Sequence, residues 1–388
     1  MKISIVGAGL AGCFTALNIA FRYRNQDVEV ELIYNPEIPP ERVGQATLFK
    51  PPALLWASIG FDWTDNPIHA TPKTGVLYEG WGKVNDKISH PFTGSSIGMH
   101  YCPWEVQKYI LNSGVFNVIE KDVDPKDVDS DYVFDCRGKP KDFSNYEEII
   151  NPINSALLSK PKWNTKECLW SRHVATPDGW TFVIPNYEES PSYNYSVGYL
   201  YNSDISSRED VKTNLLDIFD VDISDAKYIS FDSYFAKEPI VDSRIFLNGN
   251  KLFFIEPLES SATETYLYWS NICCDIINGN KTEEDGKGLI RTYIKEIENF
   301  VLWHYQFGSK YDTPFWDYAK TLKIPYDSKF NKMLDLCKGS TWDAVIPSDF
   351  GGDYSSDVHY AYWTPLSIKQ WWNAMNYKID KSSELFLY

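Results

Sequence analysis

The chain of 388 residues is long enough for one large domain or two modest ones. Its 37 basic and 53 acidic side chains leave a net charge of −16, so neither nucleic acid nor an anionic membrane surface is an expected partner. No apolar run is long enough to cross a bilayer, and the seven cysteines lack C-x-x-C spacing, which argues against a disulfide framework or a metal site and favours reduced thiols in the cytoplasm.

The first dozen residues carry the clearest motif. An apolar run over residues 3–6 predicts a strand, and a helix is expected from Leu10 to about Arg22. The glycines between them have G-x-G-x-x-G spacing in the strand–turn–helix context of a dinucleotide site, where the N–H groups at the helix start hold phosphates. The residues expected to bind the dinucleotide here are Gly7, Gly9, Leu10, Ala11 and Gly12.

The fingerprint alone does not distinguish FAD from NAD. The second predicted strand, residues 28–34, ends on Asn35, at the place where an acid usually binds a ribose hydroxyl. Asn35 can still bind a hydroxyl, but without charge. A Pro-rich loop follows at residues 36–52, and its segment Gln45, Ala46 and Thr47 lies where such folds often return to the cofactor.

The next elements continue an α/β pattern. Helices are expected at residues 53–59 and 103–112, and strands at residues 74–81 and 132–138. Residues 90–98 are expected to form a loop. The aromatic excess of 14 Trp, 26 Tyr and 21 Phe fits either a pocket for a flat substrate or an ordinary aromatic core.

Residues 151–245 have the pattern of a largely antiparallel, β-rich insertion. Strands are expected at residues 180–184, 195–201 and 227–234, with a polar helix at 208–219. A buried strand is expected at 250–257 and an amphipathic helix at 286–305, followed by a helical, aromatic-rich region and a poorly ordered tail at 380–388.

Ser261 and Glu264 have the spacing of a capping box, which predicts a helix from there to about Ile277.

Several motifs then agree in order along roughly residues 1–320. They are GAGLAG at Gly7, VGQAT at Val43, Lys73 eight residues before Trp81, HPF at His90, DCRG at Asp135, GWTFVIP at Gly179, EPLESSA at Glu256, HY at His304 and DTPFW at Asp312. In these motifs the chain resembles the flavin-dependent halogenases of the tryptophan-halogenase family, as a short variant.

The resemblance implies an α/β fold of the FAD-binding, Rossmann-type flavin monooxygenase class. The FAD module would span residues 1–285, interleaved with the substrate-side β insertion at about 151–245, and a helical region would span 286–388. It also implies that FADH2, O2 and halide (chloride, bromide or iodide) give hypohalous acid, which travels through the protein to a lysine beside an aromatic substrate. A separate flavin reductase would supply the FADH2, and the sequence is compatible with a homo-oligomer.

Two catalytic residues follow from the matched motifs. Lys73 corresponds to the lysine that presents the halogen, either by hydrogen-bonding hypohalous acid or as a haloamine, which requires burial to lower its pKa. Glu259 corresponds to the glutamate that orients hypohalous acid or takes the proton from the halogenated ring. Without the resemblance, Lys73 would be read as a surface lysine and Glu259 as an acid favoured by a helix dipole.

The remaining site residues are also carried over by motif. The halide would bind backbone N–H groups of Ser261 and Ala262, where the family commonly has Thr-Gly. Trp180 and Phe182 would form a wall between substrate and flavin, and His90 and Phe92 would lie on the substrate. No metal site is expected.

The departures from the family keep alternatives open. Gln45 replaces a Glu and Phe182 a Trp, and the altered halide site suggests a preference for a larger, easily oxidised halide. The short C-terminal third suggests a more open pocket and an electron-rich arene such as a phenol or indole rather than tryptophan. The alternatives are a flavin monooxygenase that hydroxylates a small aromatic and a non-catalytic FAD-binding protein.

Overall fold

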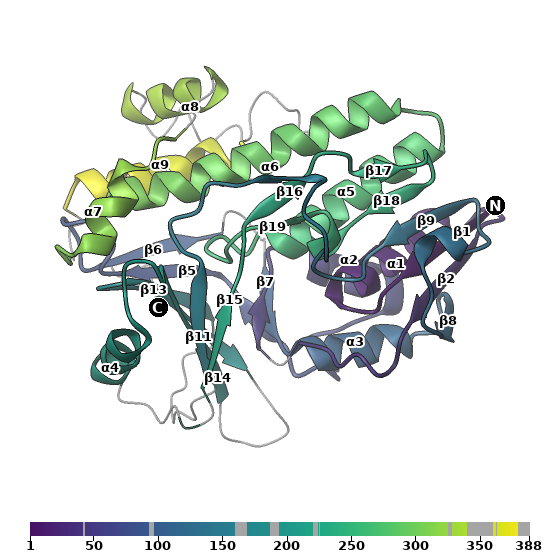
Figure 1. The fold of residues 1–388 in the computed structure, drawn as a ribbon, viewed down its shortest axis with the longest axis horizontal. Helices are drawn as coiled ribbons and strands as arrows, with labels where there is room; N and C mark the ends of the chain where they lie inside the picture. The colour runs from purple at the N-terminus through teal and green to yellow at the C-terminus, as the bar shows by residue number, and fades with distance from the viewer. Residues whose placement is uncertain are drawn as a thin grey trace.

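The structure is a computed structural model that describes residues 1–41, 43–92, 97–159, 169–186, 194–219, 224, 226–324, 328–339, 360–361 and 363–378. A six-stranded sheet and a seven-stranded sheet form its two halves. The long helix α6 (Glu283–Gln306) runs across the top of the view, above both halves (Figure 1).

The six-stranded sheet builds the nucleotide-binding half. Its order is β17 (Ile240–Val241), β18 (Ile245–Leu247), β9 (Tyr132–Asp135), β1 (Lys2–Val6), β2 (Glu29–Tyr34) and β8 (Asn117–Glu120). All neighbours are parallel except β17 and β18. Ile3 and Ile5 of the central strand are fully buried, as a strand covered on both faces requires.

Helix α1 (Leu10–Tyr23) packs against α2 (Lys50–Ile59), α3 (Pro103–Leu111) and α5 (Ala262–Ile277). The Rossmann-type α/β architecture that the motifs predicted is therefore confirmed.

The seven-stranded sheet forms the other half. Its order is β15 (Lys227–Ser230), β11 (Ser155–Ser159), β14 (Asn194–Tyr201), β13 (Gly179–Asn186), β12 (Trp170–Thr176), β5 (Gly75–Glu79) and β6 (Lys87–Pro91). Its neighbours are antiparallel except β12 and β5. Helix α4 (Arg208–Phe219) buries Val211 and Leu215 in the cluster that also holds strand β14 residues.

Two small sheets and three C-terminal helices complete the described structure. One sheet has the order β3 (Gln45–Ala46), β7 (Gly98–Tyr101) and β4 (Thr71–Lys73), and the other β10 (Tyr146–Glu148), β16 (Tyr234–Ala236) and β19 (Phe253–Phe254). Short 3₁₀ turns occupy Pro125–Asp127 and Gly249–Lys251. Helices α7 (Pro314–Thr321), α8 (Ser328–Gly339) and α9 (Pro365–Asn376) follow α6. Among the described residues, no helix is long and apolar enough to cross a membrane.

Helix α5 begins and ends close to the predicted residues, but the predicted capping box is wrong. Ser261 has helical backbone angles (φ −75°, ψ −20°) and its side chain makes no capping hydrogen bond. The Glu264 carboxylate instead pairs with Lys50 of α2, with 2.7 Å between Nζ and Oε1. A tertiary ion pair has therefore replaced the local motif.

Three further local expectations are corrected. His90 lies in strand β6, where it pairs with Val76, so only part of the expected 90–98 loop is a loop; residues 93–96 lie outside the described residues. The strand expected at 227–234 is divided between β15 and β16, which belong to different sheets, and the strand expected at 250–257 is confined to β19. The tail at 380–388 lies outside the described residues.

Candidate active site

The glycine motif forms the predicted phosphate-binding corner. Gly7 has φ +106°, and its N–H donates to the carbonyl of Ile33 at 2.8 Å. A Cβ on Gly12 would lie 1.7 Å from the Gly7 carbonyl oxygen, so only glycine allows α1 to approach β1 this closely. A Cβ on Gly9 would meet nothing within 4 Å, so open space lies in front of the helix start. A pyrophosphate fits there, against the N–H groups of α1.

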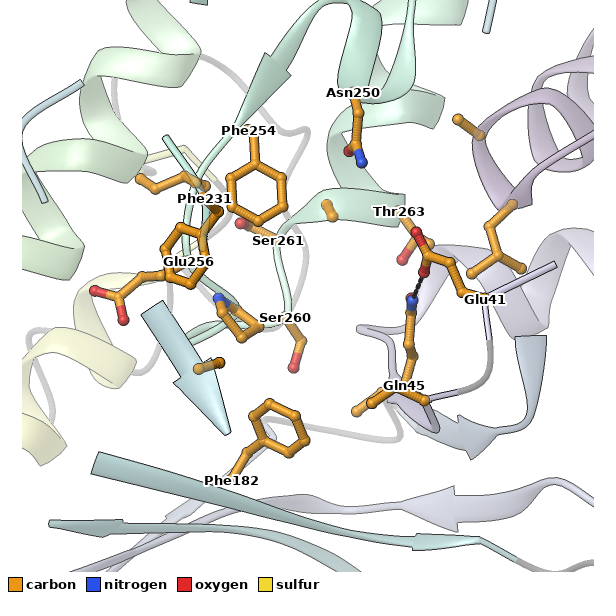
Figure 2. Close-up of a pocket in the computed structure, with 18 of the residues that line it drawn as sticks. Glu41, Gln45, Phe182, Phe231, Asn250, Phe254, Glu256, Ser260, Ser261 and Thr263 are labelled. Atoms are coloured by element: carbon orange, nitrogen blue, oxygen red, sulfur yellow. Dashed lines mark hydrogen bonds between the residues drawn. The ribbon is translucent and has the colours of Figure 1, made fainter. Parts of the chain in front are cut away.

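A cavity of about 460 Å³ opens from this corner. The predicted residues that line it are Gly9, Leu10, Ala11, Gln45, Ala46, Phe182, Ser261 and Ala262. In Figure 2, Phe182 enters the cavity from the sheet, Ser260 points into it from the opposite loop, and Glu41 and Gln45 bound one side. The glycine turn, the apolar ring of Phe182 and the polar side chains of Glu41, Gln45 and Ser260 line this cavity. Together they fit a flavin dinucleotide.

Four predicted cofactor residues do not line this cavity: Gly7 and Gly12, which shape the turn behind it, and Asn35 and Thr47. The Asn35 side chain accepts a hydrogen bond from the backbone N–H of Glu37 at 2.9 Å and closes its own turn. Thr47 is buried, donates to the Leu48 carbonyl at 2.6 Å and accepts from the Met99 N–H at 3.1 Å.

Glu41, which the sequence reasoning missed, does line the cavity and accepts a hydrogen bond from the Gln45 amide. The only sequence signal was an acid four residues before Gln45 in the Pro-rich loop.

Lys73 is fully buried at the end of β4. Its Nζ donates to Ser260 Oγ at 2.9 Å and lies 5.4 Å from the centre of the Phe92 ring. Burial lowers the pKa of Lys73 to about 7, although the nearby Glu259 charge opposes the shift. The surface-lysine interpretation is therefore excluded, and an amine that is partly neutral near pH 7 remains.

Ser260 connects Lys73 to the cavity. Its hydroxyl accepts from Lys73, and the residue also lines the cavity. Its φ of +53° is unusual for a residue with a side chain, and the surrounding loop must hold it there.

Glu259 is 5 % exposed and lies within an aromatic cluster. Its Oε1 accepts a hydrogen bond from Tyr78 and lies 2.9 Å from His304 Nε2, and its Oε2 accepts from Trp363 Nε1 at 2.9 Å. Burial alone would raise the pKa of Glu259, but the His304 charge and these hydrogen bonds lower it to about 2. Glu259 is therefore a carboxylate at neutral pH.

The geometry also indicates the charge on His304. Its Nδ1 lies 2.7 Å from the Phe300 carbonyl, and its Nε2 faces Glu259. A carbonyl oxygen and a carboxylate oxygen are both acceptors, so both ring nitrogens must donate. His304 is accordingly an imidazolium paired with Glu259, and it was known from the sequence only as part of the HY motif.

Of the predicted substrate-side residues, His90 lies near this pair. His90 is buried and its Nε2 lies 2.7 Å from Ser367 Oγ of α9. Burial lowers the pKa of His90 to about 4, so its ring is neutral at pH 7. Trp363 donates to Glu259, and Ser367 of α9 lies on His90. Because residues 340–359 lie outside the described residues, the expected more open pocket stays a prediction.

Trp180 and Phe182, the residues predicted to form the wall, lie on β13. Trp180 is fully buried and Phe182 is 7 % exposed, with 6.3 Å between their ring centres. Phe182 lines the cavity, whereas Trp180 lies behind it and donates from Nε1 to Glu256 Oε2 at 2.8 Å. Among the described residues, no group of three or more potential ligands could hold a metal ion.

The fold and the cavity define a flavin-dependent enzyme of the α/β class. The family described as tryptophan halogenase matches residues 2–116 and 124–349, so the chain belongs to the tryptophan halogenase family. The predicted enzyme class, an FADH2-dependent halogenase with FADH2, O2 and halide as reactants, is confirmed by this membership.

Solved structures agree on the fold. A tryptophan halogenase from Shewanella frigidimarina NCIMB 400 has a TM-score of 0.78 at 15% identity, covering 100% of this chain and 92% of that chain. BrvH, a flavin-dependent halogenase from Brevundimonas sp. BAL3, has a TM-score of 0.74 at 16% identity, covering 98% of this chain and 90% of that chain. No curated protein sequence matches the chain.

Proposed function

We propose that Lys73 receives halogen from the FAD cavity and transfers it to an electron-rich arene beside Glu259. The observation that carries this proposal is the hydrogen bond between the buried Lys73 and the cavity-lining Ser260. A flavin monooxygenase that hydroxylates its substrate would have no need of a buried amine at this place, so the contact favours a halogenase.

When bound, FADH2 supplies with O2 the oxidising power that converts halide to hypohalous acid. The N–H groups at the start of α5, at Ser261 and Ala262, would hold the halide, because the first turn of a helix has unpaired donors. Trp180 and Phe182 would keep the arene out of the cavity.

The neutral Lys73 amine would then attack the halogen of hypohalous acid. An N–X bond forms, the O–X bond breaks, and the released hydroxide leaves with an amine proton as water. Transfer of the halogen to the ring returns the N–X electron pair to nitrogen. Glu259 takes the ring proton, which an arenium ion gives up even to a weak base, and a proton returns to the amine. The sum is one arene C–H and one hypohalous acid giving one C–X bond and water.

We propose a phenol or indole as the substrate class, a separate flavin reductase as the source of FADH2, and a cytoplasmic location. The five described cysteines are free and buried, which fits a reducing compartment. His90 and Phe92 would position the ring, Phe92 lying beside Lys73.

The test is a screen for monohalogenated arenes with a supplied reductase and each halide in turn. The expected result is a halide-dependent mass shift with the wild-type protein. Lys73→Ala should still bind FAD and oxidise FADH2 but form no aryl halide. A hydroxylated product, or full halogenation by Lys73→Ala, would overturn the proposal. Competition between halides tests the expected preference for a larger halide.

A further inference from the structure

Glu256 is a buried acid that the proposed reaction does not use. It is 1 % exposed, and both hydrogen bonds reach the same oxygen. Oε2 accepts from Trp180 Nε1 at 2.8 Å and from Tyr305 OH at 2.8 Å. Oε1 has no partner among the described residues, although it is completely shielded from solvent.

These contacts join three parts of the site. Trp180 belongs to the wall on β13, Tyr305 follows His304 in α6, and Glu256 itself begins the loop that ends in Glu259 and Ser260. Figure 2 shows the Glu256 carboxylate turned away from the cavity, with Ser260 of the same loop pointing into it. The Glu256 carboxyl group therefore connects strand β13 to helix α6, which carries His304, and to the loop that carries Glu259.

We propose that Glu256 is a positioning residue that fixes Trp180 and α6 relative to the Glu259 loop and so keeps halogen transfer to the arene coupled to flavin oxidation. This inference rests on the proposed halogenation.

The pattern of hydrogen bonds favours the neutral acid. A charged carboxylate with one bare oxygen would be costly in this apolar surrounding. Consistently, burial raises the pKa of Glu256 to about 8, although Trp180 and Tyr305 oppose the shift.

Within the part of the chain that the structure describes, no cation offsets the charge of Glu256. Its two partners are an indole and a phenol, and burial raises the pKa of Tyr305 well above its ordinary value. His173, whose ring centre lies 4.8 Å from that of Trp180, is kept neutral because burial lowers its pKa. The His304 imidazolium is already paired with Glu259. When Glu256 loses its proton, its carboxylate needs stabilisation from water or from a shift of Trp180.

The experiment measures coupling, defined as aryl halide formed per FADH2 oxidised. The neutral fraction of a group with a pKa of about 8 falls from about nine-tenths at pH 7 to about one-tenth at pH 9, so wild-type coupling should fall several-fold across this range. Glu256→Gln keeps an acceptor for Trp180 and Tyr305 and cannot ionise, so its coupling should not fall between pH 7 and pH 9. Glu256→Ala should be uncoupled at both pH values.

The matched control is Glu298→Gln, which removes a different buried acid, one that lies in α6, and should keep the wild-type pH profile. A wild-type profile in Glu256→Gln, or full coupling in Glu256→Ala, would overturn the inference.

A second measurement does not depend on activity. Difference infrared spectra should show a protonated carboxyl band at pH 7 that disappears on raising the pH through about 8 and is missing from Glu256→Gln. If no variant halogenates any arene but this band behaves as expected, the proposed function fails and the protonation of Glu256 stands. If halogenation occurs and the band is missing, the inference about Glu256 fails alone.

Discussion

At the scale of single residues, the burial of Lys73 has a measurable consequence. Because its pKa is lowered to about 7, the neutral amine that attacks halogen becomes the major form only above this pH. The rate of arene halogenation should therefore rise as pH increases through about 7, while FADH2 oxidation does not follow the same curve. Stopped-flow oxidation and product analysis across pH distinguish the two.

Lys73→Arg is the control for this prediction. Arginine keeps a charged donor for Ser260 but stays protonated and is a poor nucleophile. The variant should oxidise FADH2 and form no aryl halide at any pH. Halogenation by Lys73→Arg would show that the residue acts by hydrogen-bonding hypohalous acid instead of through a haloamine.

The pair of Glu259 and His304 predicts a coupling between two buried side chains. Removing one partner of a buried ion pair leaves the other charge uncompensated, which costs about 3–5 kcal/mol. His304→Gln and Glu259→Gln should each lower the free energy of unfolding at pH 7 by an amount near the lower end of this range. Their double variant should lose less than the sum. Urea unfolding of the four proteins measures this, and strictly additive losses would contradict the charged pair.

At the scale of elements, the sequence predicted those whose signal is local. The glycine corner was predictable because strand, turn and helix lie within about twenty residues and only glycine fits there. The prediction of a capping box failed because Glu264 pairs with Lys50, which lies more than two hundred positions earlier in the sequence. No local sequence pattern indicates such a contact. The position of His90 was missed because its strand has only one neighbouring strand, β5, and its side chain is covered by the distant α9.

Contacts between distant parts of the sequence were also missed around the candidate catalytic residues. The motif match supplied Lys73 and Glu259, but no sequence pattern indicated that Trp363 would donate to Glu259 from a segment about a hundred residues later. Composition recorded the aromatic excess without distinguishing a core from a pocket. The structure shows that the rings in contact with Glu259, those of Tyr78, His304 and Trp363, are buried.

Trp363 provides a prediction for the C-terminal segment as an element. Trp363→Phe keeps a ring against Phe300, whose centre lies 3.8 Å away, but removes the donor to Glu259. Loss of a hydrogen bond to a charged group should cost about 1.5–3 kcal/mol and lower arene kcat/KM while leaving FAD affinity unchanged. Trp372→Phe, a change on α9 that packs on Phe307 instead, is the control. Equal losses in both variants would argue against a specific role for Trp363.

At the scale of the whole molecule, the proposed function needs a wall between the FAD cavity and the arene, and the candidate wall residue Phe182 is held by the pairing of β13 with β14. Phe182 pairs with Gly198 across these strands, and a Cβ on Gly198 would lie 2.2 Å from the Phe182 ring. Residues paired across strands face the same side, so the ring covers Gly198 and borders the FAD cavity.

Gly198→Ala should push the ring into the space of the flavin and weaken FAD binding at least about tenfold, or about 1.4 kcal/mol. Adding Phe182→Leu to Gly198→Ala should restore FAD affinity, because the smaller side chain makes room for the methyl group, but should leave arene halogenation less coupled, because the wall is thinner. Fluorescence titration with FAD gives the affinities and product analysis gives the coupling. Unchanged FAD affinity in Gly198→Ala would mean that the backbone of the sheet shifts to make room for the methyl group. The proposed role of Phe182 as a fixed wall would then be wrong.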